Sequence, residues 1–488
     1  MASIMDDCLK HSEKYPERLA IISEEGNLTY KEWAALLSKQ ASWFTAFGHS
    51  NRTVGICLSN PKLFLTVFAG AALAGWTVVP FDQRWTEYEL KERVSLSNPS
   101  IIIASEHLMG HFNGIDSRLY RWAEYWREVQ AASDAERMPV DGSSPFYMGF
   151  TSGSTGTPKA FIRSQSSWIE SFSCDTIDFQ RSGKDHVLIA GSLLHSHFLY
   201  GALSTLHLGG SIYLLSSFSA GRVYHSIECN PITALYLVPT MLESLVQEDR
   251  VIHKELVIIS SGAKWQDQLK LRVREVFPNS RLYEYYGASE LSYVAYMCNQ
   301  EKPGSVGKAF YNVQLDIRGN DGSSLPPNRA GRIYVKSPMT FLGYKEKSSG
   351  SLRAVHDKDG WMTVGDIGSL DEEGYLTIAG RENNMILYGG INIFPEEVES
   401  VLLGHPSVEQ AVVLGIKDEH WGEIAAAVIK GNASRKELKK YCRERLASYK
   451  VPREWHFINT MPLTAGGKIS RPLLYEHLGR RSYNCKTR

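Results

Sequence analysis

The sequence predicts a multi-domain α/β protein. Its 488 residues exceed the roughly 250–300 residues that a single hydrophobic core usually serves. Over the first three quarters of the chain, short apolar runs alternate with helical stretches, which is typical of layered, mostly parallel α/β folds. After about residue 304 the pattern changes to alternating strands and turns, and after about residue 396 to a more basic α+β pattern.

Each predicted element rests on a local pattern. Apolar residues at helical spacing predict a helix over 38–47. Apolar runs of strand length predict buried strands at 53–58, 101–104, 187–190 and 256–259. Alternating runs predict strands at 313–317 and 331–335, in a region with turns such as Asn320-Asp321-Gly322. The charged stretch 436–446 predicts an amphipathic helix.

These changes of pattern divide the chain, with a boundary near residues 381–384. We predict a large N-terminal domain over 1–382, made of layered α/β subdomains and a β-rich subdomain at about 304–380. A small, mobile α+β domain over 383–488 follows it.

One segment is apolar enough to need a decision about membranes. No charged residue occurs from Leu63 to Phe81, a length that approaches a membrane span. Asn60-Pro61 just before it is typical of a helix start, and Thr77–Pro80 has the composition of a strand. We therefore predict a buried helix followed by a core strand.

Composition and charge exclude several classes of protein. The formal net charge is zero, whereas nucleic-acid-binding proteins need an excess of Lys and Arg. The seven cysteines are scattered and form no C-x-x-C pair, which favours free thiols in a reducing compartment over a disulfide framework or a zinc site. The segment 1–14 has no apolar core of a signal peptide. We expect a cytoplasmic protein without a transmembrane segment.

The strongest chemical signal is the segment 150–159. It reads Phe150-Thr151-Ser152-Gly153-Ser154-Thr155-Gly156-Thr157-Pro158-Lys159. Glycines let successive backbone N–H groups converge on an anion, and hydroxyl groups and a lysine add donors for phosphate oxygens. The spacing is not that of a Walker A loop, and the alternative interpretation is a flexible polar turn.

Further motifs follow in order along the chain. They are Tyr286-Gly287-Ala288-Ser289-Glu290, the segment 360–366 ending in Asp366, Gly380-Arg381, the segment 389–399 beginning with Gly389-Gly390, and the segment 462–471 containing Lys468. Together with 150–159, they resemble the motifs of the adenylate-forming superfamily, which comprises acyl-CoA synthetases, adenylation domains of peptide synthetases and luciferases. The resemblance covers essentially the whole chain.

The resemblance implies a two-step reaction that uses ATP, Mg²⁺ and coenzyme A. A carboxylate and MgATP would form an acyl-adenylate and pyrophosphate, and the acyl group would then pass to coenzyme A with release of AMP. The implied catalytic residues are Lys468, Thr151, Glu290 and His195, with Glu290 as the Mg²⁺ ligand. The implied nucleotide- and coenzyme-A-binding residues are Thr151, Ser152, Gly153, Ser154, Thr155, Gly156, Lys159, Gly262, Ala263, Tyr286, Gly287, Ser289, Asp366, Arg381, Gly389, Gly390 and Trp421.

These implied roles agree with the chemistry of the side chains. Lys468 in a glycine-rich loop can offer a mobile positive charge where negative charge develops on the α-phosphate. A carboxylate such as Glu290 near phosphates requires an intervening cation, and Mg²⁺ prefers oxygen ligands. Each residue also has an ordinary alternative, namely a solvated surface lysine or a helix-terminal acid. For Trp421 the alternative is a core position.

The same resemblance implies the residues of an acyl pocket. They are His195, Ser261, Gly262, Tyr285, Gly287, Ser292 and Tyr293. None is charged, so a dicarboxylate or a charged amino acid is disfavoured. A medium- or long-chain fatty acid is the favoured substrate, and an aryl acid fits almost as well. We expect the nearby His197 to be a packing residue.

The chain departs from the superfamily pattern at three positions that matter here. Ala160 follows the phosphate motif where glycine is more frequent, and Arg332 replaces a frequent acid. Asn383 occupies the implied hinge position, where Asp or Lys is typical. The resemblance implies that the C-terminal domain rotates at this hinge, which would exchange Lys468 for the Gly389-Gly390 loop between the two steps.

Two alternatives stay open at this point. A stand-alone adenylation enzyme would load an acyl carrier protein in trans instead of coenzyme A. A non-catalytic nucleotide-binding homologue is disfavoured, because Lys159, Glu290, Asp366 and Lys468 are all present. The sequence does not predict an oligomeric state.

Overall fold

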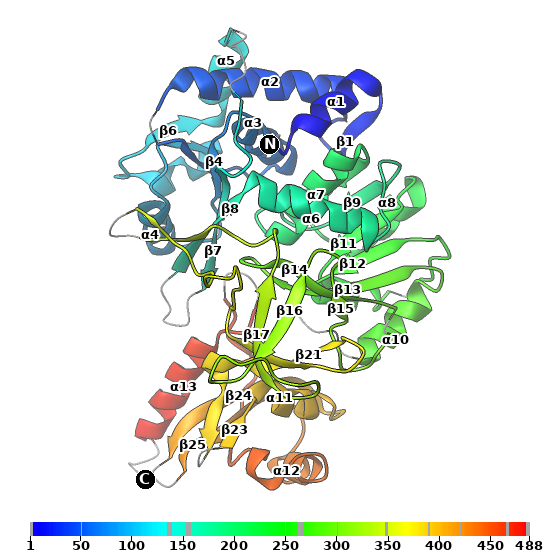
Figure 1. The fold of residues 1–488 in the computed structure, drawn as a ribbon, viewed down its shortest axis with the longest axis vertical. Coiled ribbons are helices and arrows are strands. Elements are labelled where there is room, and N and C mark those ends of the chain that lie inside the picture. Colours follow the sequence, from blue (N-terminus) through cyan, green and yellow to red (C-terminus); the bar gives the residue numbers. More distant parts are fainter. Residues whose placement is uncertain are drawn as a thin grey trace. The chain divides into compact units, whose positions relative to one another are not determined.

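The computed structural model describes residues 3–49, 51–133, 139–152, 158–248, 250–261, 265, 267–299, 301–346, 350–388, 391–418, 421–464 and 468–484. The chain packs as two compact units (Figure 1). The first holds most residues up to 315 together with 335–362, and the second holds 316–334 and the residues from 363 onward. The functional domain boundary at 382/383 stays a prediction.

The first unit contains a nine-stranded sheet in the order β15-β14-β13-β12-β11-β9-β10-β1-β2. Its strands are β1 (Leu19–Ser23), β2 (Leu28–Thr29), β9 (His186–Ile189), β10 (Ser211–Leu214), β11 (Ala234–Leu237), β12 (Val257–Ser260), β13 (Arg281–Ala288), β14 (Ser292–Cys298) and β15 (Lys308–Ala309). Pairing is parallel from β13 to β1 and antiparallel at both edges. The predicted runs at 187–190 and 256–259 are therefore confirmed as strands of a parallel sheet.

An eight-stranded sheet in the same unit has the order β19-β18-β8-β7-β4-β3-β5-β6. Its strands are β3 (Thr53–Cys57), β4 (Thr77–Pro80), β5 (Ile101–Ala104), β6 (Arg118–Arg121), β7 (Pro145–Ser152), β8 (Pro158–Ser164), β18 (Gly343–Lys345) and β19 (Leu352–Arg353). The antiparallel hairpin β7–β8 flanks the predicted phosphate motif, and β18 pairs with β8.

Helices cover and separate these two sheets. They are α1 (Asp6–Lys14), α2 (Tyr30–Phe47), α3 (Pro61–Leu73), α4 (Glu87–Ser97), α5 (Trp122–Ala131), α6 (Gln165–Ile177), α7 (Ser196–Leu208), α8 (Ala220–Cys229), α9 (Pro239–Leu245) and α10 (Asp267–Val276), with a 3₁₀ turn η1 (Glu106–Phe112). Helix α6 contacts β7 and β8, whereas α7 contacts β9, β10 and β11. Because α6 and α7 also contact each other (Figure 1), they join the two sheets.

The apolar segment 63–81 folds as predicted. Asn60 caps α3 by accepting a 3.0 Å hydrogen bond from the backbone N–H of Leu63, and Pro61 is the first helical residue. All of β4 is buried. No helix among the described residues is long and apolar enough to cross a membrane.

The second unit contains two sheets. The strands β16 (Gln314–Arg318), β17 (Gly331–Lys336), β20 (Asp366–Leu370) and β21 (Leu376–Arg381) form a four-stranded sheet in that order, followed by the 3₁₀ turn η2 (Glu382–Asn384). The other sheet has β22 (Ile386–Tyr388), β23 (Ile391–Ile393), β24 (Val408–Asp418), β25 (Gly422–Gly431) and β26 (Glu454–Phe457). Three helices, α11 (Pro395–Leu403), α12 (Arg435–Arg443) and α13 (Arg471–Asn484), and the turn η3 (Ser448–Lys450) complete the unit.

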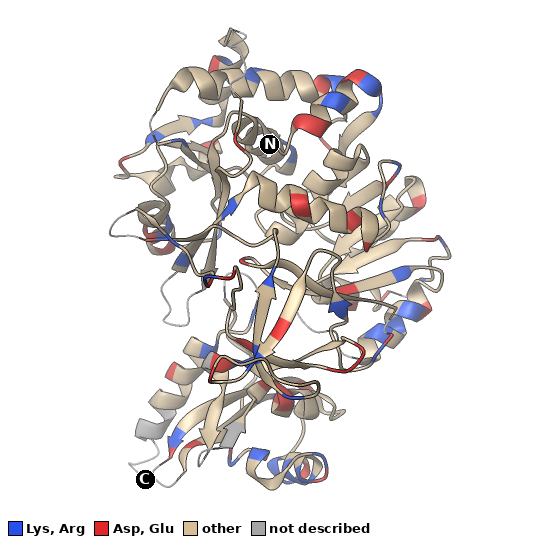
Figure 2. Ribbon diagram, viewed as in Figure 1, with Lys and Arg blue, Asp and Glu red and all other residues tan. Residues whose placement is uncertain are grey.

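Strand alternation builds two small cores around β24. Ala411 and Val413 pack in a cluster with residues of α11 and α12, whereas Val412 and Leu414 pack in a cluster with Leu474 of α13. The predicted amphipathic helix is confirmed as α12, in which five of nine residues are Lys or Arg (Figure 2) and Leu438 and Cys442 are buried.

The described cysteines agree with the expected free thiols. Cys8, Cys57, Cys174, Cys229, Cys298 and Cys442 are all unbridged. Cys485 lies outside the described residues.

Candidate active site

Glu290 lies in the turn between β13 and β14, and it is 8% exposed. Its Oε1 accepts a 2.8 Å hydrogen bond from the hydroxyl group of Tyr344 on β18. The hydroxyl group of Thr151, at the end of β7, donates to the same oxygen at 3.4 Å. The structure therefore brings Thr151 and Glu290, which the sequence predicted as catalytic, to one place.

Tyr344 was not predicted from the sequence. It reaches Glu290 because β18 pairs with β8, where Tyr344 lies opposite Phe161. The amino group of Lys159 lies 5.5 Å from the centre of the Tyr344 ring, within reach of a cation–π interaction. Tyr344 thus links the predicted metal ligand to the predicted phosphate-binding lysine.

A buried arginine on β8 holds the backbone next to Glu290. Arg163 is 3% exposed and donates to the backbone oxygen of Ser289 at 3.1 Å and to that of Met339 at 2.6 Å. Burial lowers the pKa of the Arg163 guanidinium to about 10. Arg163 fixes the turn that carries Glu290, and no local pattern around Arg163 predicts this role.

The hairpin β13–β14 carries Tyr286, Gly287, Ser289 and Ser292 close to Glu290. A Cβ atom on Gly287 would lie 2.1 Å from the backbone oxygen of Ser292, so only glycine fits there. Ser292 itself has a φ of 63°, which is rare for a residue with a side chain.

A histidine–tyrosine pair lies at the predicted acyl pocket. Nδ1 of His197 is 2.9 Å from the hydroxyl oxygen of Tyr285, and Nε2 is 3.0 Å from the backbone oxygen of Leu237. A carbonyl only accepts, so Nε2 carries the proton and the Tyr285 hydroxyl donates to Nδ1. Burial lowers the pKa of His197 to about 4, so the ring is neutral near pH 7. His197 is therefore more than the packing residue that we expected.

The other predicted pocket residues occupy different surroundings. A hydrogen bond joins Ser261 to Tyr285, whose pKa is raised by burial. His195 is exposed at the N-cap position of α7. Tyr293 is 2% exposed, and its hydroxyl group donates to Asp175 at 3.3 Å. That hydroxyl group is therefore engaged in a hydrogen bond within the protein.

In the second unit, three predicted residues lie near one another. Nε of Arg381 forms a 3.0 Å ion pair with Oδ1 of Asp366, which is 3% exposed and lies opposite Arg381 in the β20–β21 pair. Desolvation lowers the pKa of Lys468, and the positive charge of Arg381 lowers it further. The backbone N–H of Thr464 donates a 2.7 Å hydrogen bond to the backbone oxygen of Lys468.

The predicted hinge lies between two polar contacts of the same unit. Arg332 donates to both carboxylate oxygens of Glu382, with Nη2–Oε1 at 2.6 Å and Nε–Oε2 at 3.1 Å. On the other side, the Asn384 amide donates to Oε1 of Glu396 at 3.1 Å. The side chain of Asn383 lies outside the described residues.

Trp421 lies against an aromatic and a cationic side chain. Its ring stacks on that of Tyr388, with centres 4.5 Å apart, and the guanidinium of Arg453 lies 5.0 Å from the Trp421 ring. Part of the tryptophan surface is thus covered by its own unit.

Several predicted positions belong to segments that the structure does not describe. Gly153, Ser154, Thr155, Gly156, Gly262, Ala263, Gly389, Gly390 and the side chain of Ser152 lie outside the described residues. Their roles stay predictions.

The residues around Glu290 fit a Mg²⁺ ion that is bound together with a nucleotide. Within the described ranges no group of three or more His, Cys, Asp or Glu side chains is arranged for a metal. Mg²⁺ is commonly held by one or two carboxylates, substrate phosphates and water. Glu290 and the hydroxyl group of Thr151 would hold such an ion, which would neutralise charge on the phosphates.

Comparisons with known proteins agree with this site. The AMP-binding enzyme family matches residues 8–345, and the AMP-binding enzyme C-terminal domain matches residues 397–468. The uncharacterized acyl-CoA ligase YhfT of Bacillus subtilis (strain 168) is 45% identical over 94% of this chain and 95% of its own length. The putative long chain fatty acid-CoA ligase VraA of Staphylococcus epidermidis is 29% identical over 96% of this chain and 97% of its own.

A solved structure shows the same architecture. It is that of the o-succinylbenzoate CoA synthetase MenE from Bacillus subtilis, in complex with the acyl-adenylate intermediate OSB-AMP. Its TM-score is 0.87, with 28% identity, and the match covers 96% of this chain and 97% of MenE. Enzymes of this kind use ATP, Mg²⁺ and coenzyme A, as the sequence predicted. The chain belongs to the AMP-binding enzyme family, as an acyl-CoA ligase that works through an acyl-adenylate.

Proposed function

We propose that this ligase activates a carboxylic acid whose acyl group is apolar and carries no further charge. It then transfers the acyl group to coenzyme A. The observation that carries the proposal is the pair Tyr285–His197, because its ring nitrogens and hydroxyl group are used in hydrogen bonds within the protein. Neither side chain carries a charge near pH 7, so this pair offers no partner to a second carboxylate or an ammonium group of the substrate.

In the first step, Glu290 and Thr151 would hold Mg²⁺, which would neutralise charge on the ATP phosphates, and Lys159 would contact phosphate oxygens. Asp366 and Arg381 bind the ribose side of the nucleotide. Lys468 stabilises the charge that develops on the α-phosphate as the carboxylate attacks. The contacts of Tyr344 and Thr151 with Glu290 support this assignment.

In the second step, the domain that begins near Asn383 rotates and exchanges Lys468 for the Gly389-Gly390 loop. Trp421 then lies along the path of coenzyme A. The polar contacts Arg332–Glu382 and Asn384–Glu396 on the two sides of Asn383 support a pivot at that residue.

Two substrate classes remain candidates. A medium- or long-chain fatty acid is the sequence prediction, and the similarity to VraA, a putative long chain fatty acid-CoA ligase, supports it. An aryl acid is the second candidate, and the aromatic rings of Tyr285 and Tyr293 favour it. An acyl carrier protein in trans is the alternative acceptor. The free cysteines agree with the cytoplasmic location that we propose.

Turnover assays distinguish these possibilities. Pyrophosphate and AMP release would be measured with MgATP and a panel of fatty, aryl and amino acids, each with and without coenzyme A. Turnover that needs an apolar acid and coenzyme A supports the proposal. Pyrophosphate release that coenzyme A does not turn into sustained turnover points to a carrier protein, and preference for a charged acid contradicts the proposed pocket.

A further inference from the structure

The ring of Tyr285 is held from several sides. Its hydroxyl group is hydrogen-bonded to His197 at 2.9 Å. Its ring packs edge-on against Tyr293, with centres 4.7 Å apart, and Tyr293 stacks on Phe310 at 4.7 Å. Phe179 packs against Tyr293 from another direction at 5.5 Å. Close-packed rings leave Tyr285 little room to swing aside.

His197 is fixed as firmly as its partner. Its Nε2 donates to the backbone oxygen of Leu237 on β11, and its ring packs edge-on against Tyr236 at 5.2 Å. Tyr236 lies directly against helix α7, since a Cβ atom on Gly201 would be only 2.7 Å from the Tyr236 ring. Tyr285 of β13 and His197 of α7, which is hydrogen-bonded to β11, therefore form a rigid surface. We call this pair of side chains the wall.

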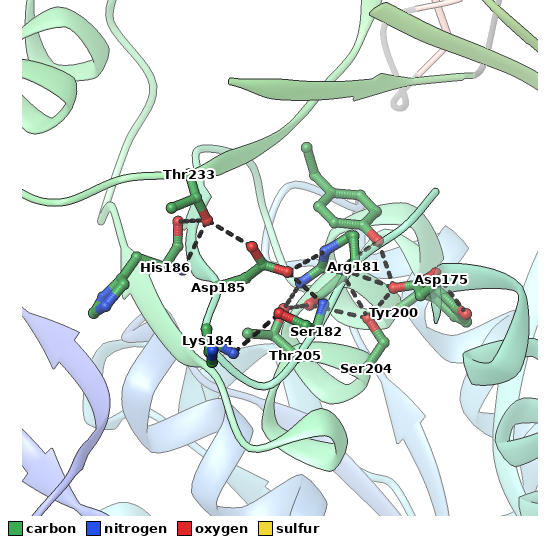
Figure 3. A network of polar contacts seen from close by, with 12 residues as sticks. Asp175, Arg181, Ser182, Lys184, Asp185, His186, Tyr200, Ser204, Thr205 and Thr233 are labelled. Carbon is green, nitrogen blue, oxygen red and sulfur yellow. Dashed lines mark hydrogen bonds and ion pairs between the residues drawn. The ribbon is translucent and has the colours of Figure 1, made fainter. Parts of the chain in front are cut away.

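A buried charge network stands behind this wall. Figure 3 shows Asp175 of α6 facing Arg181, Tyr200 and Ser204, and the Asp175 and Arg181 side chains, 2.8 Å apart, are both 0% exposed. Asp175 also accepts hydrogen bonds from the hydroxyl groups of Tyr236 at 3.0 Å and Tyr293 at 3.3 Å.

These two tyrosines are the ones that pack against His197 and Tyr285. His197 and Tyr285 are therefore each supported by a tyrosine whose hydroxyl group donates to the carboxylate of Asp175. Displacing either tyrosine would break a buried hydrogen bond to a carboxylate, which is costly, so the wall resists displacement.

We propose that Tyr285, tethered to His197, limits the length of the acyl group, and that Asp175 is a positioning residue that holds this wall through Tyr236 and Tyr293. The inference rests on the proposed function and restricts the proposed substrates to acids with a compact acyl group. We expect the enzyme to accept a compact acid, such as benzoate, phenylacetate or a short branched acid. A long acyl chain would have to break the Tyr285–His197 hydrogen bond and displace packed rings.

The test compares acid profiles of the wild-type enzyme and three variants. Acid-dependent pyrophosphate release would be measured with benzoate, phenylacetate, hexanoate, decanoate and palmitate. Tyr285→Ala removes the wall, Tyr285→Phe removes only the tether, and Tyr236→Phe removes one brace. Tyr224→Phe is the matched control, because Tyr224 is a buried tyrosine that donates to the Leu245 backbone oxygen at 2.8 Å outside this network.

The wild-type enzyme is expected to prefer the compact acids. Tyr285→Ala should raise kcat/KM for decanoate relative to benzoate by about tenfold or more, as expected when several methylenes gain a pocket. Tyr285→Phe and Tyr236→Phe should shift the profile in the same direction by a smaller factor, while KM for ATP stays unchanged. If these residues had a purely structural role, their substitution would instead lower kcat/KM equally for all acids and would lower Tm.

Two results would overturn the inference while leaving the proposed function intact. One is a wild-type preference for palmitate or decanoate over benzoate. The other is an unchanged profile in the folded Tyr285 variants. If no acid supports pyrophosphate release by the wild-type enzyme, the proposed function fails, and this inference fails with it.

Discussion

The hydroxyl group of Tyr344 donates a 2.8 Å hydrogen bond to Oε1 of Glu290. We expect Tyr344→Phe to lower kcat/KM for MgATP in pyrophosphate release by about 10- to 100-fold, since hydrogen bonds to charged groups contribute about 1.5–3 kcal/mol. The loss should be partly recovered at high Mg²⁺, because the tyrosine orients the metal ligand.

Tyr88→Phe is the matched control for that experiment. Tyr88 also donates to a glutamate, Glu92, at 3.2 Å, but it is 71% exposed. Its loss should leave the Mg²⁺ dependence unchanged. Equal effects of the two substitutions would argue against a role of Tyr344 in metal binding.

Lys468→Ala separates the two half-reactions. Adenylate formation should fall by about 100-fold or more, since the lysine stabilises developing charge. Thioester formation from pre-made acyl-adenylate should stay within a few-fold of wild type. The measurements are acid-dependent pyrophosphate release and single-turnover thioester formation, with Lys436→Ala on α12 as the control. Equal loss of both half-reactions would rule out the domain exchange proposed for Lys468.

The ion pair Arg332–Glu382 makes a prediction about the hinge. Both side chains are about one third exposed, at 35% and 37%, so the pair should contribute at most about 1 kcal/mol to stability. Arg332→Glu should therefore change Tm little. We expect it to change the ratio of AMP release to pyrophosphate release by about two- to fivefold, through the hinge. The double exchange Arg332→Glu with Glu382→Arg should restore the ratio, and failure to restore it would exclude the pair as a hinge contact.

His197 predicts a pH dependence of stability. Its pKa is about 4 in the folded protein, because burial opposes the charge, and about 6.5 in an unfolded chain. The unfolded state therefore binds the proton more tightly, so stability is present above pH 6.5 and is lost as pH falls toward 4. The loss is at most about 3 kcal/mol.

Denaturant unfolding at pH 7.5 and 5 checks this sign. His197→Gln should reduce the difference in unfolding free energy between the two pH values, and His253→Gln, at an exposed residue, should not. An unchanged difference in the His197 variant would contradict the assignment of a neutral ring.

Local patterns sufficed for much of the fold. The helix α3 and strand β4 follow from Asn60-Pro61 and the apolar run behind them, because a cap and a buried strand are encoded within a few residues. The functional boundary near residue 382 is harder to derive, since 316–334 group with residues from 363 onward, whereas 335–362 group with the first unit. Such packing depends on contacts between distant segments.

The same limit applies to the site. Motifs identified Thr151 and Glu290, which are 139 residues apart in the chain and yet in contact. Arg163 and Tyr344 belong to no motif, and their partners Ser289 and Glu290 are 126 and 54 residues away. The hydrogen bond between His197 and Tyr285 spans 88 residues. These contacts between distant segments form only in the folded chain, so no local pattern reveals the supporting residues.

The most direct test of the central claim is acid-dependent exchange of labelled pyrophosphate into ATP, followed by thioester analysis. With an apolar acid and MgATP, the account predicts exchange without coenzyme A, and thioester plus AMP in equal amounts once coenzyme A is added. Exchange that needs no acid, or AMP release with coenzyme A present but no thioester formed, would contradict an acyl-CoA ligase that works through an acyl-adenylate.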